Sequence, residues 1–270
     1  MVENYELAVI GAGTMAEAII RGALKSGYLS PESVVACDLN PERRELFESE
    51  FGVATTDDIQ VCAPCPYILL ATKPYNVDEV LSAIAPNVHE GVTVISICAG
   101  VTSKHLSDLL GGKGRVVRAM PNTPIQVGAG ASVVASGPRC EDENLQWAHR
   151  LFDVSGLSVI IPEDKMDAVT GLSGSGPAYV FYLIEAMIEA GIAEGVDADT
   201  SRDLVLQTCE GAVKLVRESG LCPAELRRLV TTPNGTTQRA IETLQAHGFR
   251  EAILEAIHNA KLRTEEFREG

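Results

Sequence analysis

Four threonines surround one turn in the last part of the chain, within Val230-Thr231-Thr232-Pro233-Asn234-Gly235-Thr236-Thr237-Gln238. The pattern predicts that a helix begins directly after this turn, which brings hydroxyls and free backbone N–H groups to one helix start. Such donors bind a carboxylate or a polar ring nitrogen. A capped turn whose threonines contact only solvent explains the same residues. The turn is therefore a candidate anion site with a plain structural alternative.

A second unusual stretch is Thr170-Gly171-Leu172-Ser173-Gly174-Ser175-Gly176-Pro177-Ala178-Tyr179. It places three glycines ahead of a long apolar helix, which costs stability unless the backbone must approach another group closely. Pro177 suits a first helical turn and Ser175 is a candidate cap. A close crossing between two helices would require the same glycines.

Near the start of the chain, the apolar run 7–10 breaks into Gly11-Ala12-Gly13-Thr14-Met15-Ala16 and resumes as a helix. Gly11 would permit a sharp reversal, Gly13 would let the backbone approach a pyrophosphate, and Ala16 would let helix and strand pack closely. The phosphates would face free N–H groups at the helix start. An ordinary strand-to-helix turn is the alternative, but the strand-turn-helix context favours a dinucleotide site.

Asp38 lies about 25 residues after Gly13, near where a dinucleotide fold places the acid that binds the ribose 2′-hydroxyl. This acid favours NADH. Asn40, Arg43 and Arg44 follow at once, and guanidinium groups there would bind a 2′-phosphate and favour NADPH.

The two arginines also have a structural interpretation. Arg43 and Arg44 would then lie on a solvated helix face and pair with Glu48 and Glu50. The sequence leaves these alternatives open.

The elements that must position these residues alternate between strands and helices. Buried strands are predicted at 33–38, 66–71, 92–97 and 115–120, and edge strands at 128–136 and 157–161 around a helix at 141–152. This alternation predicts a parallel, doubly wound sheet of the Rossmann type, with ligands at the carboxyl ends of its strands. Lys73, which follows one such strand, is well placed to line the ligand crevice.

From residue 163 onward only helical periodicity is found, which predicts a dinucleotide-binding domain at 1–162 and an all-helical domain at 163–270. Asp197 would cap a helix that ends at Gly220, Pro223 would begin the next, and a last helix would span 249–267. The helix around Val180–Ile192 is apolar on nearly every face, and a domain this small cannot bury it alone. We therefore expect a homo-oligomer.

The composition excludes several classes of partner. The chain has 22 basic and 37 acidic residues, a net charge of -15, which repels nucleic acid and anionic membranes. The first residues lack the basic region of a signal peptide, and no apolar stretch of 18 residues is free of charge. These features predict a cytoplasmic protein that binds neither nucleic acid nor membrane.

The chain has seven cysteines, an odd number, and they are scattered along the sequence. We therefore expect most of them to be free thiols that pack as small buried hydrophobic side chains. Cys62 and Cys65 have the spacing of a redox or metal pair, but a plain loop before a strand is the favoured explanation. No second pair lies nearby and the five histidines are dispersed, so no metal site is expected.

Taken together, five stretches resemble the pyrroline-5-carboxylate reductases, the last enzymes of proline biosynthesis. The match runs in order from about residue 7 to residue 263, and its two later motifs distinguish this family from other dinucleotide-binding reductases. The stretches are Gly11–Ala16, Ala71–Pro74, Arg118–Pro124, Ser173–Tyr179 and Thr232–Thr237.

The resemblance implies an N-terminal Rossmann domain, a C-terminal helical domain that interleaves with a second subunit, and a homodimer or larger oligomer. It implies hydride transfer from NADPH or NADH to the C=N bond of 1-pyrroline-5-carboxylate, giving L-proline, with NADPH favoured by the family and NADH left open by Asp38.

The implied site has three parts. The cofactor set is Gly11, Ala12, Gly13, Thr14, Met15, Ala16, Asp38, Asn40, Arg43, Ala71, Thr72, Lys73, Pro74, Cys98, Ala99 and Asn122. The substrate set is Glu163, Thr232, Gly235, Thr236 and Thr237. Thr237 matches the threonine that hydrogen-bonds the ring nitrogen and is the expected catalytic residue.

Two departures from the family pattern bear on these expectations. Asn234 stands where glycine is usual, although asparagine tolerates the left-handed conformation that the turn needs. Asp57 and Asp58 lie where many members have an asparagine near the adenosine, and acids there would weaken binding of a 2′-phosphate.

Two rival functions fit the fold. A hydroxyacid or sugar-acid dehydrogenase would need a catalytic lysine, but Lys214 and Lys261 lie in ordinary helical patterns. A nucleotide-binding scaffold would leave the threonine turn without a role. The sequence leaves open the NADPH-to-NADH preference, the number of subunits, the proton donor, activity on related cyclic imines, and any role of Cys62 and Cys65.

Overall fold

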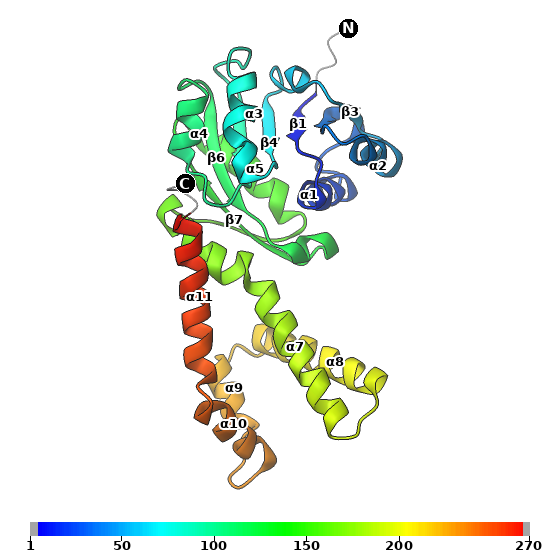
Figure 1. Cartoon of the computed structure of the whole chain (residues 1–270), viewed down its shortest axis with the longest axis vertical. Coiled ribbons are helices and arrows are strands. Elements are labelled where there is room, and N and C mark those ends of the chain that lie inside the picture. Colours follow the sequence, from blue (N-terminus) through cyan, green and yellow to red (C-terminus); the bar gives the residue numbers. More distant parts are fainter. Residues whose placement is uncertain (1–4, 267–270) are drawn as a thin grey trace. The chain divides into compact units, whose positions relative to one another are not determined.

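Eight strands form one sheet in the order β3-β2-β1-β4-β5-β6-β7-β8 in the computed structural model, which describes residues 5–266 (Figure 1). Neighbouring strands from β3 to β6 are parallel, β7 is antiparallel to β6, and β8 is parallel to β7. The order reverses between β1 and β4, where a doubly wound fold binds its ligand. The strands are β1 Leu7–Ile10, β2 Val34–Cys37, β3 Ala54–Thr56, β4 Tyr67–Leu70, β5 Thr93–Ser96, β6 Arg115–Met120, β7 Gly130–Ser136 and β8 Gly156–Ile160.

Helices cover both faces of the sheet, which is why its central strands are apolar at successive positions. Leu7 and Val9 of β1 belong to one core with α1, α2 and α5, whereas Ala8 and Ile10 belong to a second core with α3 and α4. Successive side chains of a strand point to opposite faces, so β1 contributes to both cores. The helices are α1 Thr14–Lys25, α2 Pro41–Phe51, α3 Val77–Ile84, α4 Ser103–Leu109 and α5 Asp142–Asp153.

The predicted α/β fold is confirmed, with two corrections at the margins of the sheet. Strand β3 was missed because it has only three half-buried residues and no apolar run. The segment predicted as an edge strand at 128–136 is β7, which lies inside the sheet because β8 pairs beyond it. Strands β3 and β8 are therefore the two edges.

After β8, the described residues are helical or in loops. Asp197 accepts a hydrogen bond from the Thr200 N–H at 3.0 Å, Gly220 has a φ of 71°, and Pro223 begins α9. These helix limits confirm the prediction; the predicted end at Phe267 lies outside the described residues. The elements are α6 Met166–Val169, α7 Gly176–Ala193, α8 Ala198–Ser219, α9 Pro223–Leu229, α10 Thr236–Ala246 and α11 Phe249–Glu266.

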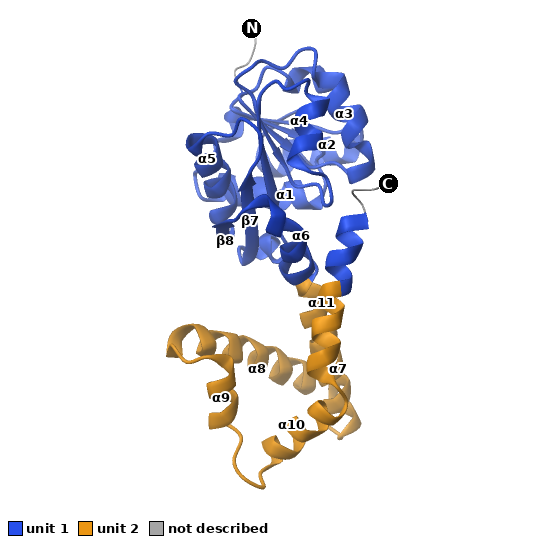
Figure 2. Cartoon of the chain, turned by 90° about the vertical axis from the view of Figure 1, so that its left-hand side faces the viewer, with its two compact units in different colours: residues 1–175, 259–270 blue, residues 176–258 orange. Residues whose placement is uncertain are grey.

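The described residues divide into two compact units, 5–175 with 259–266 and 176–258 (Figure 2). Within the second unit, α7 packs against α8, and yet Val180, Phe181 and Tyr182 are 50%, 61% and 74% exposed. A single chain therefore leaves the apolar helix α7 largely uncovered. None of the described helices is long and apolar enough to cross a bilayer.

The glycines expected ahead of a helix lie instead within one helical run. The Ser175 N–H donates to the Thr170 carbonyl at 2.8 Å, five residues back, so Thr170–Gly174 forms a wide π turn between α6 and α7. Ser175 consequently does not cap a helix start, which corrects the prediction. Wide turns of this kind insert an extra residue into a helix and are frequent at functional sites.

Gly156 should be irreplaceable for the pairing of β7 with β8. Its φ is 142°, and a Cβ there would lie 2.2 Å from the Gly130 carbonyl oxygen. We expect Gly156→Ala to lower the free energy of unfolding by about 3 kcal/mol, because backbone cannot move aside cheaply. Urea unfolding measures this loss.

The matched control is Gly27→Ala, whose φ of 74° is also positive but whose Cβ would meet nothing within 4 Å. That variant should lose only about 1 kcal/mol, the cost of the left-handed conformation. Equal losses in the two variants would contradict the steric argument.

Candidate functional site

A cleft of about 610 Å³ lies at the carboxyl ends of β1, β2 and β4, where the strand order reverses. It includes residues from the glycine turn, from the end of β2 and from the segment after β4. Of the predicted cofactor residues, the cleft is lined by Gly11, Gly13, Thr14, Met15, Asp38, Ala71, Thr72 and Lys73. These eight residues from three separate stretches thus share one surface.

The glycine turn has the geometry that a dinucleotide needs. Gly11 has a φ of 95°, and a Cβ on it would lie 2.8 Å from the Ala71 carbonyl oxygen, so no other residue fits there. Gly13 is extended, with φ −72° and ψ 178°, and precedes the first residue of α1. A Cβ on Gly13 would meet nothing within 4 Å, so the turn is open on the side of the cleft where a phosphate would meet the N–H groups of α1.

Thr72 supplies a second indication that the cleft takes a ligand. Its Oγ1 is buried and, apart from the weakly bonding Cys98 thiol beside it, has no hydrogen-bond partner among residues 5–266. An unpaired buried hydroxyl is costly, and a bound polar molecule would satisfy it. The glycine turn and Thr72 together fit a dinucleotide.

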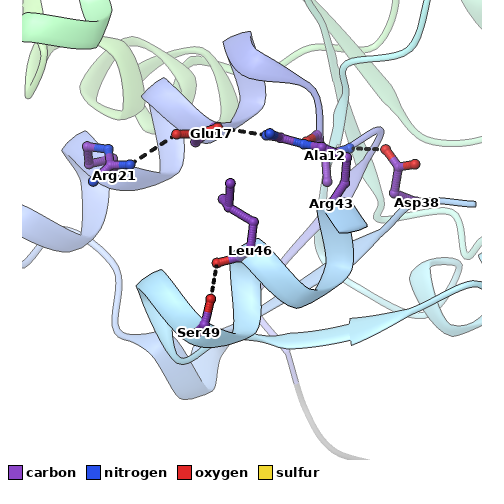
Figure 3. Close-up of polar contacts among 7 residues, drawn as sticks. All are labelled: Ala12, Glu17, Arg21, Asp38, Arg43, Leu46 and Ser49. Atoms are coloured by element: carbon purple, nitrogen blue, oxygen red, sulfur yellow. Dashed lines mark hydrogen bonds and ion pairs between the residues drawn. The ribbon is translucent and has the colours of Figure 1, made fainter. Parts of the chain in front are cut away.

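Asp38 lies at the end of β2, beside the glycine turn (Figure 3). One carboxylate oxygen accepts a hydrogen bond from the Ala12 N–H at 2.7 Å, and the other accepts from the Asn40 N–H at 2.9 Å. The Asn40 side chain accepts from the Glu42 N–H at 2.9 Å and so caps α2. Asn40 therefore positions the helix that carries the two arginines.

Both arginines are held by acids other than those considered from the sequence. Arg43 donates to the Ala12 carbonyl at 2.5 Å and to Glu17 at 2.7 Å (Figure 3). Arg44 donates to the Asp38 carbonyl at 2.7 Å and lies 3.6 Å from Asp57. The pairing with Glu48 and Glu50 is therefore wrong, because the fold brings acids from α1 and from the segment after β3 within reach.

Glu17 is the acid that fixes Arg43. Burial acts to raise the pKa of Glu17, but hydrogen bonds from Arg43 and Arg21 outweigh burial and hold the pKa below its usual value. Glu17 consequently stays ionised at neutral pH and keeps Arg43 in place.

The other predicted cofactor residues lie outside the lining of this cleft. Ala12 and Ala16 are fully buried beneath the turn. The Cys98 thiol donates to the Thr72 carbonyl at 3.3 Å, and burial raises its pKa. Ala99 packs against the small core around Met120, Val133, Ala135 and Met166. Neither Cys98 nor Ala99, nor Pro74, lines the cleft of about 610 Å³.

Asn122 is also committed within the protein. Its amide nitrogen donates to the Ser173 carbonyl at 3.1 Å and its amide oxygen accepts from the Ala131 N–H at 2.8 Å. Asn122 thus joins the end of β6 to the wide π turn and to β7.

Glu163 is part of a charged cluster that sequence reasoning did not assemble. One of its oxygens accepts from the Ser103 N–H at 2.8 Å and from Arg118 at 3.1 Å, and the other accepts from the Ser103 hydroxyl. Arg118 is only 2% exposed on β6. Burial acts to raise the pKa of Glu163, but Ser103 and Arg118 outweigh burial and lower it. An arginine between Val117 and Ala119, in the middle of a buried strand, was the available signal, but it did not identify the partner.

The threonine turn lies in the second unit and has the conformation that its sequence suggests. Asn234 has a φ of 59°, which confirms that asparagine supports the left-handed position. The Gly235 N–H donates to the Thr232 carbonyl at 3.0 Å, and the Asn234 N–H donates to Gln238 at 2.8 Å. Helix α10 then begins at Thr236.

The hydroxyls at this helix start are uncommitted. No side chain caps α10, and the hydroxyls of Thr236 and Thr237 have no hydrogen-bond partner among residues 5–266. Thr231, by contrast, donates to the Arg227 carbonyl at 2.6 Å. Thr232 and Thr236 are exposed to solvent and the Gln238 side chain accepts from the turn, so the capped turn with solvated threonines and the anion site both stay compatible with the structure. Donors remain available at the start of α10.

Cys62 and Cys65 are buried free thiols, and burial raises the pKa of Cys65 to about 11. Within residues 5–266, His, Cys, Asp and Glu form no cluster of three that could hold a metal ion. Burial and the raised thiol pKa favour the loop interpretation of the pair over a reactive one.

Comparison with known proteins assigns both parts of the chain. A family described as NADP oxidoreductase coenzyme F420-dependent matches residues 6–100, and pyrroline-5-carboxylate reductase dimerisation matches residues 163–267. A pyrroline-5-carboxylate reductase of Methanosarcina acetivorans is 38% identical over 98% of this chain and 98% of that protein.

Solved structures agree. A pyrroline-5-carboxylate reductase from Coxiella burnetii superposes with a TM-score of 0.90 at 32% identity, with 98% of each chain covered. The Plasmodium falciparum pyrroline carboxylate reductase with NADP bound has a TM-score of 0.90 at 28% identity, over 98% of this chain and 99% of that one.

The fold and the cleft, together with these matches, define an oxidoreductase that uses NAD(P)H and carries a C-terminal dimerisation region. More specifically, the chain belongs to the pyrroline-5-carboxylate reductase family.

Gly13→Ala should separate cofactor binding from stability. Its extended φ and ψ suit alanine and its Cβ would contact no protein atom, so the free energy of unfolding should stay within about 0.5 kcal/mol of wild type. The added methyl would occupy the space where a pyrophosphate approaches, and NAD(P)H should bind at least about 10-fold more weakly. Quenching of protein fluorescence by the cofactor measures this affinity, and unchanged affinity would contradict the assigned position of the pyrophosphate.

Glu163→Gln should destabilise the first unit, because it leaves Arg118 buried without a counter-ion. We expect a loss of about 2 kcal/mol at pH 7. The folded-state pKa of Glu163 is lowered from 4.5, so its contribution is present above that pH and disappears as the pH falls through the lowered pKa. The difference in the free energy of unfolding between wild type and variant should therefore become smaller at acidic pH.

Urea unfolding at pH 7 and at about pH 4 tests this dependence. Asp164→Asn is the control, because Asp164 forms only an exposed ion pair with Lys165 and should change stability by less than about 0.5 kcal/mol. A deficit for Glu163→Gln that does not vary with pH would contradict the electrostatic explanation.

Proposed function

We propose that this protein reduces 1-pyrroline-5-carboxylate to L-proline with NAD(P)H, the last step of proline biosynthesis. The observation that carries the proposal is the set of uncommitted donors at the start of α10, in a chain whose first unit contains a dinucleotide cleft. The donors suit the ring nitrogen and carboxylate of a small cyclic imino acid, and the cleft suits the reductant.

The reduced nicotinamide, when bound, supplies the hydride that adds to the C=N carbon. The N–H groups at the start of α10 would hold the substrate carboxylate, with Thr232, Gly235 and Thr236 around it. Thr237, which is half-buried, would donate its hydroxyl hydrogen to the ring nitrogen and orient the ring. A threonine hydroxyl is too weak an acid to protonate the imine strongly, so the proton would come from water. Most of the rate enhancement would come from alignment of the two bound molecules.

Glu163 belongs to the same proposal in a supporting role. Its carboxylate already accepts hydrogen bonds from Ser103 and Arg118, so it would shape the substrate pocket by fixing the start of α4. Helix α4 follows the turn that contains Cys98 and Ala99, the residues expected near the nicotinamide.

We infer that the active form is a cytoplasmic homodimer or a larger homo-oligomer assembled through the helical region 163–270. The dimerisation match at 163–267 and the exposed apolar side chains of α7 support this assembly. In this proposal the division at 162/163 separates a cofactor-binding domain from a substrate-binding and dimerisation domain.

Thr237→Val should impair reduction without unfolding the protein. Valine keeps the volume of the side chain and removes the hydroxyl, so kcat/KM for 1-pyrroline-5-carboxylate should fall about 100-fold. The loss of absorbance as NAD(P)H is oxidised measures the rate, with NADH and NADPH assayed in parallel.

Thr243→Ala is the matched control, because Thr243 lies on the same helix and its hydroxyl donates only to the Arg239 carbonyl. Its kcat/KM should stay within about twofold of wild type. Unchanged kinetics in Thr237→Val would remove Thr237 from the site, and no oxidation of either cofactor by the wild type would refute the proposed activity.

A further inference from the structure

The contacts around Asp38 bear on which of the two nicotinamide cofactors this chain selects. Asp38 lines the cleft at the end of β2, the position from which a doubly wound fold contacts the adenosine ribose. NADPH carries a phosphate on the 2′-oxygen of this ribose, whereas NADH carries a hydroxyl.

The Asp38 carboxylate is fixed but not saturated. Each of its oxygens accepts one backbone hydrogen bond, from the Ala12 N–H at 2.7 Å and from the Asn40 N–H at 2.9 Å. A carboxylate oxygen can accept two hydrogen bonds, so one acceptor position remains on each oxygen. Two adjacent acceptors match the vicinal 2′- and 3′-hydroxyls of an unphosphorylated ribose. A 2′-phosphate brings negative charge and no matching donors.

The cations that a 2′-phosphate would need are already engaged by groups of the protein. Arg43 donates to the Ala12 carbonyl and to Glu17, and Arg44 donates to two backbone carbonyls and pairs with Asp57 (Figure 3 for Arg43). Neither guanidinium lines the cleft, although Asp38 and its neighbour Leu39 do.

The remaining cation of the cleft lies away from this ribose. Lys73 follows β4, and β4 and β2 flank β1 on opposite sides. Lys73 is therefore positioned for the other half of the dinucleotide. On the side of β2 and β3, each arginine is matched by an acid, and Asp38 and Asp58 add further negative charge.

We propose that the chain selects NADH over NADPH, with Asp38 as the specificity-determining residue and with the charges of Arg43 and Arg44 already paired with Glu17 and Asp57. This inference rests on the proposed function for its biological meaning, because it names the reductant of that reaction. Its central measurement, however, is binding and does not require turnover.

The test compares dissociation constants of NADH and NADPH, each measured by quenching of protein fluorescence on the intact protein. The wild type should bind NADH at least about 10-fold more tightly than NADPH. Asp38→Asn removes the charge at the cost of one of the two backbone hydrogen bonds, because its NH2 group cannot accept an N–H. The loss of charge should shift the ratio toward NADPH by at least about 10-fold. Glu50→Gln makes the same change of charge at the exposed end of α2 and should leave the ratio unchanged.

A second variant tests the proposal independently, in case Asp38→Asn fails to fold. The double variant Glu17→Gln with Asp57→Asn removes the acids that pair with Arg43 and Arg44 and keeps both Asp38 and the backbone hydrogen bonds of the arginines. It should tighten NADPH binding without weakening NADH. Equal or tighter binding of NADPH by the wild type would overturn the proposal, as would a ratio that neither variant changes. Failure of the reductase assay with both cofactors, alongside the expected binding ratio, would refute the proposed function alone.

Discussion

The first unit depends on one steric constraint, the close contact between the backbone of Gly11 and the backbone of Ala71 just after β4. The Gly11 N–H donates to the Cys37 carbonyl and the Ala71 N–H donates to the Ile10 carbonyl, each at 2.9 Å, so the turn is fastened to both neighbouring strands. A side chain on Gly11 would strike the Ala71 carbonyl. Because the turn cannot move outward, α1 begins directly above the sheet and points its free N–H groups at the cleft. Asp38 and Thr72 follow the two flanking strands, so the same constraint places both of them at the site.

A second constraint is the buried charge between β6 and the segment after β8. Arg118 is almost fully buried and donates to Glu163, whose carboxylate also accepts hydrogen bonds from Ser103. Such a pair adds little net stability, because two charges must leave water to form it. Removing one partner is nevertheless strongly destabilising, because the other charge is then buried unpaired. Its effect is therefore to fix geometry. It ties the start of α4 to the residues that lead into α6 and the wide π turn.

The two units differ in how fully a single chain buries their apolar side chains and pairs their polar groups. The sheet unit buries two continuous cores and pairs its arginines within itself. The helical unit leaves the aromatic and aliphatic side chains of α7 exposed, and the hydroxyls that begin α10 have no partner among the described residues. An exposed apolar helix and unused donors are both unfavourable in isolation, and both are the features expected where another chain and a ligand bind.

The sequence by itself determined the features that arise within a few residues. Local backbone preferences explain three of these features: the strand-glycine-helix pattern at 7–16, the helix limits at Asp197, Gly220 and Pro223, and the left-handed conformation of Asn234. The family could also be recognised, because its motifs are short and local.

Only the tertiary structure decided the partners of the charged side chains and the details of the sheet edges. Arg43 binds Glu17 rather than Glu48, and Arg118 binds a carboxylate 45 residues further along the chain. Strand β3, the inner position of β7 and the wide π turn at Thr170–Gly174 likewise depend on neighbours that are distant in sequence. The physical reason is that Coulombic and packing energies depend on distance in space, which local propensities do not encode.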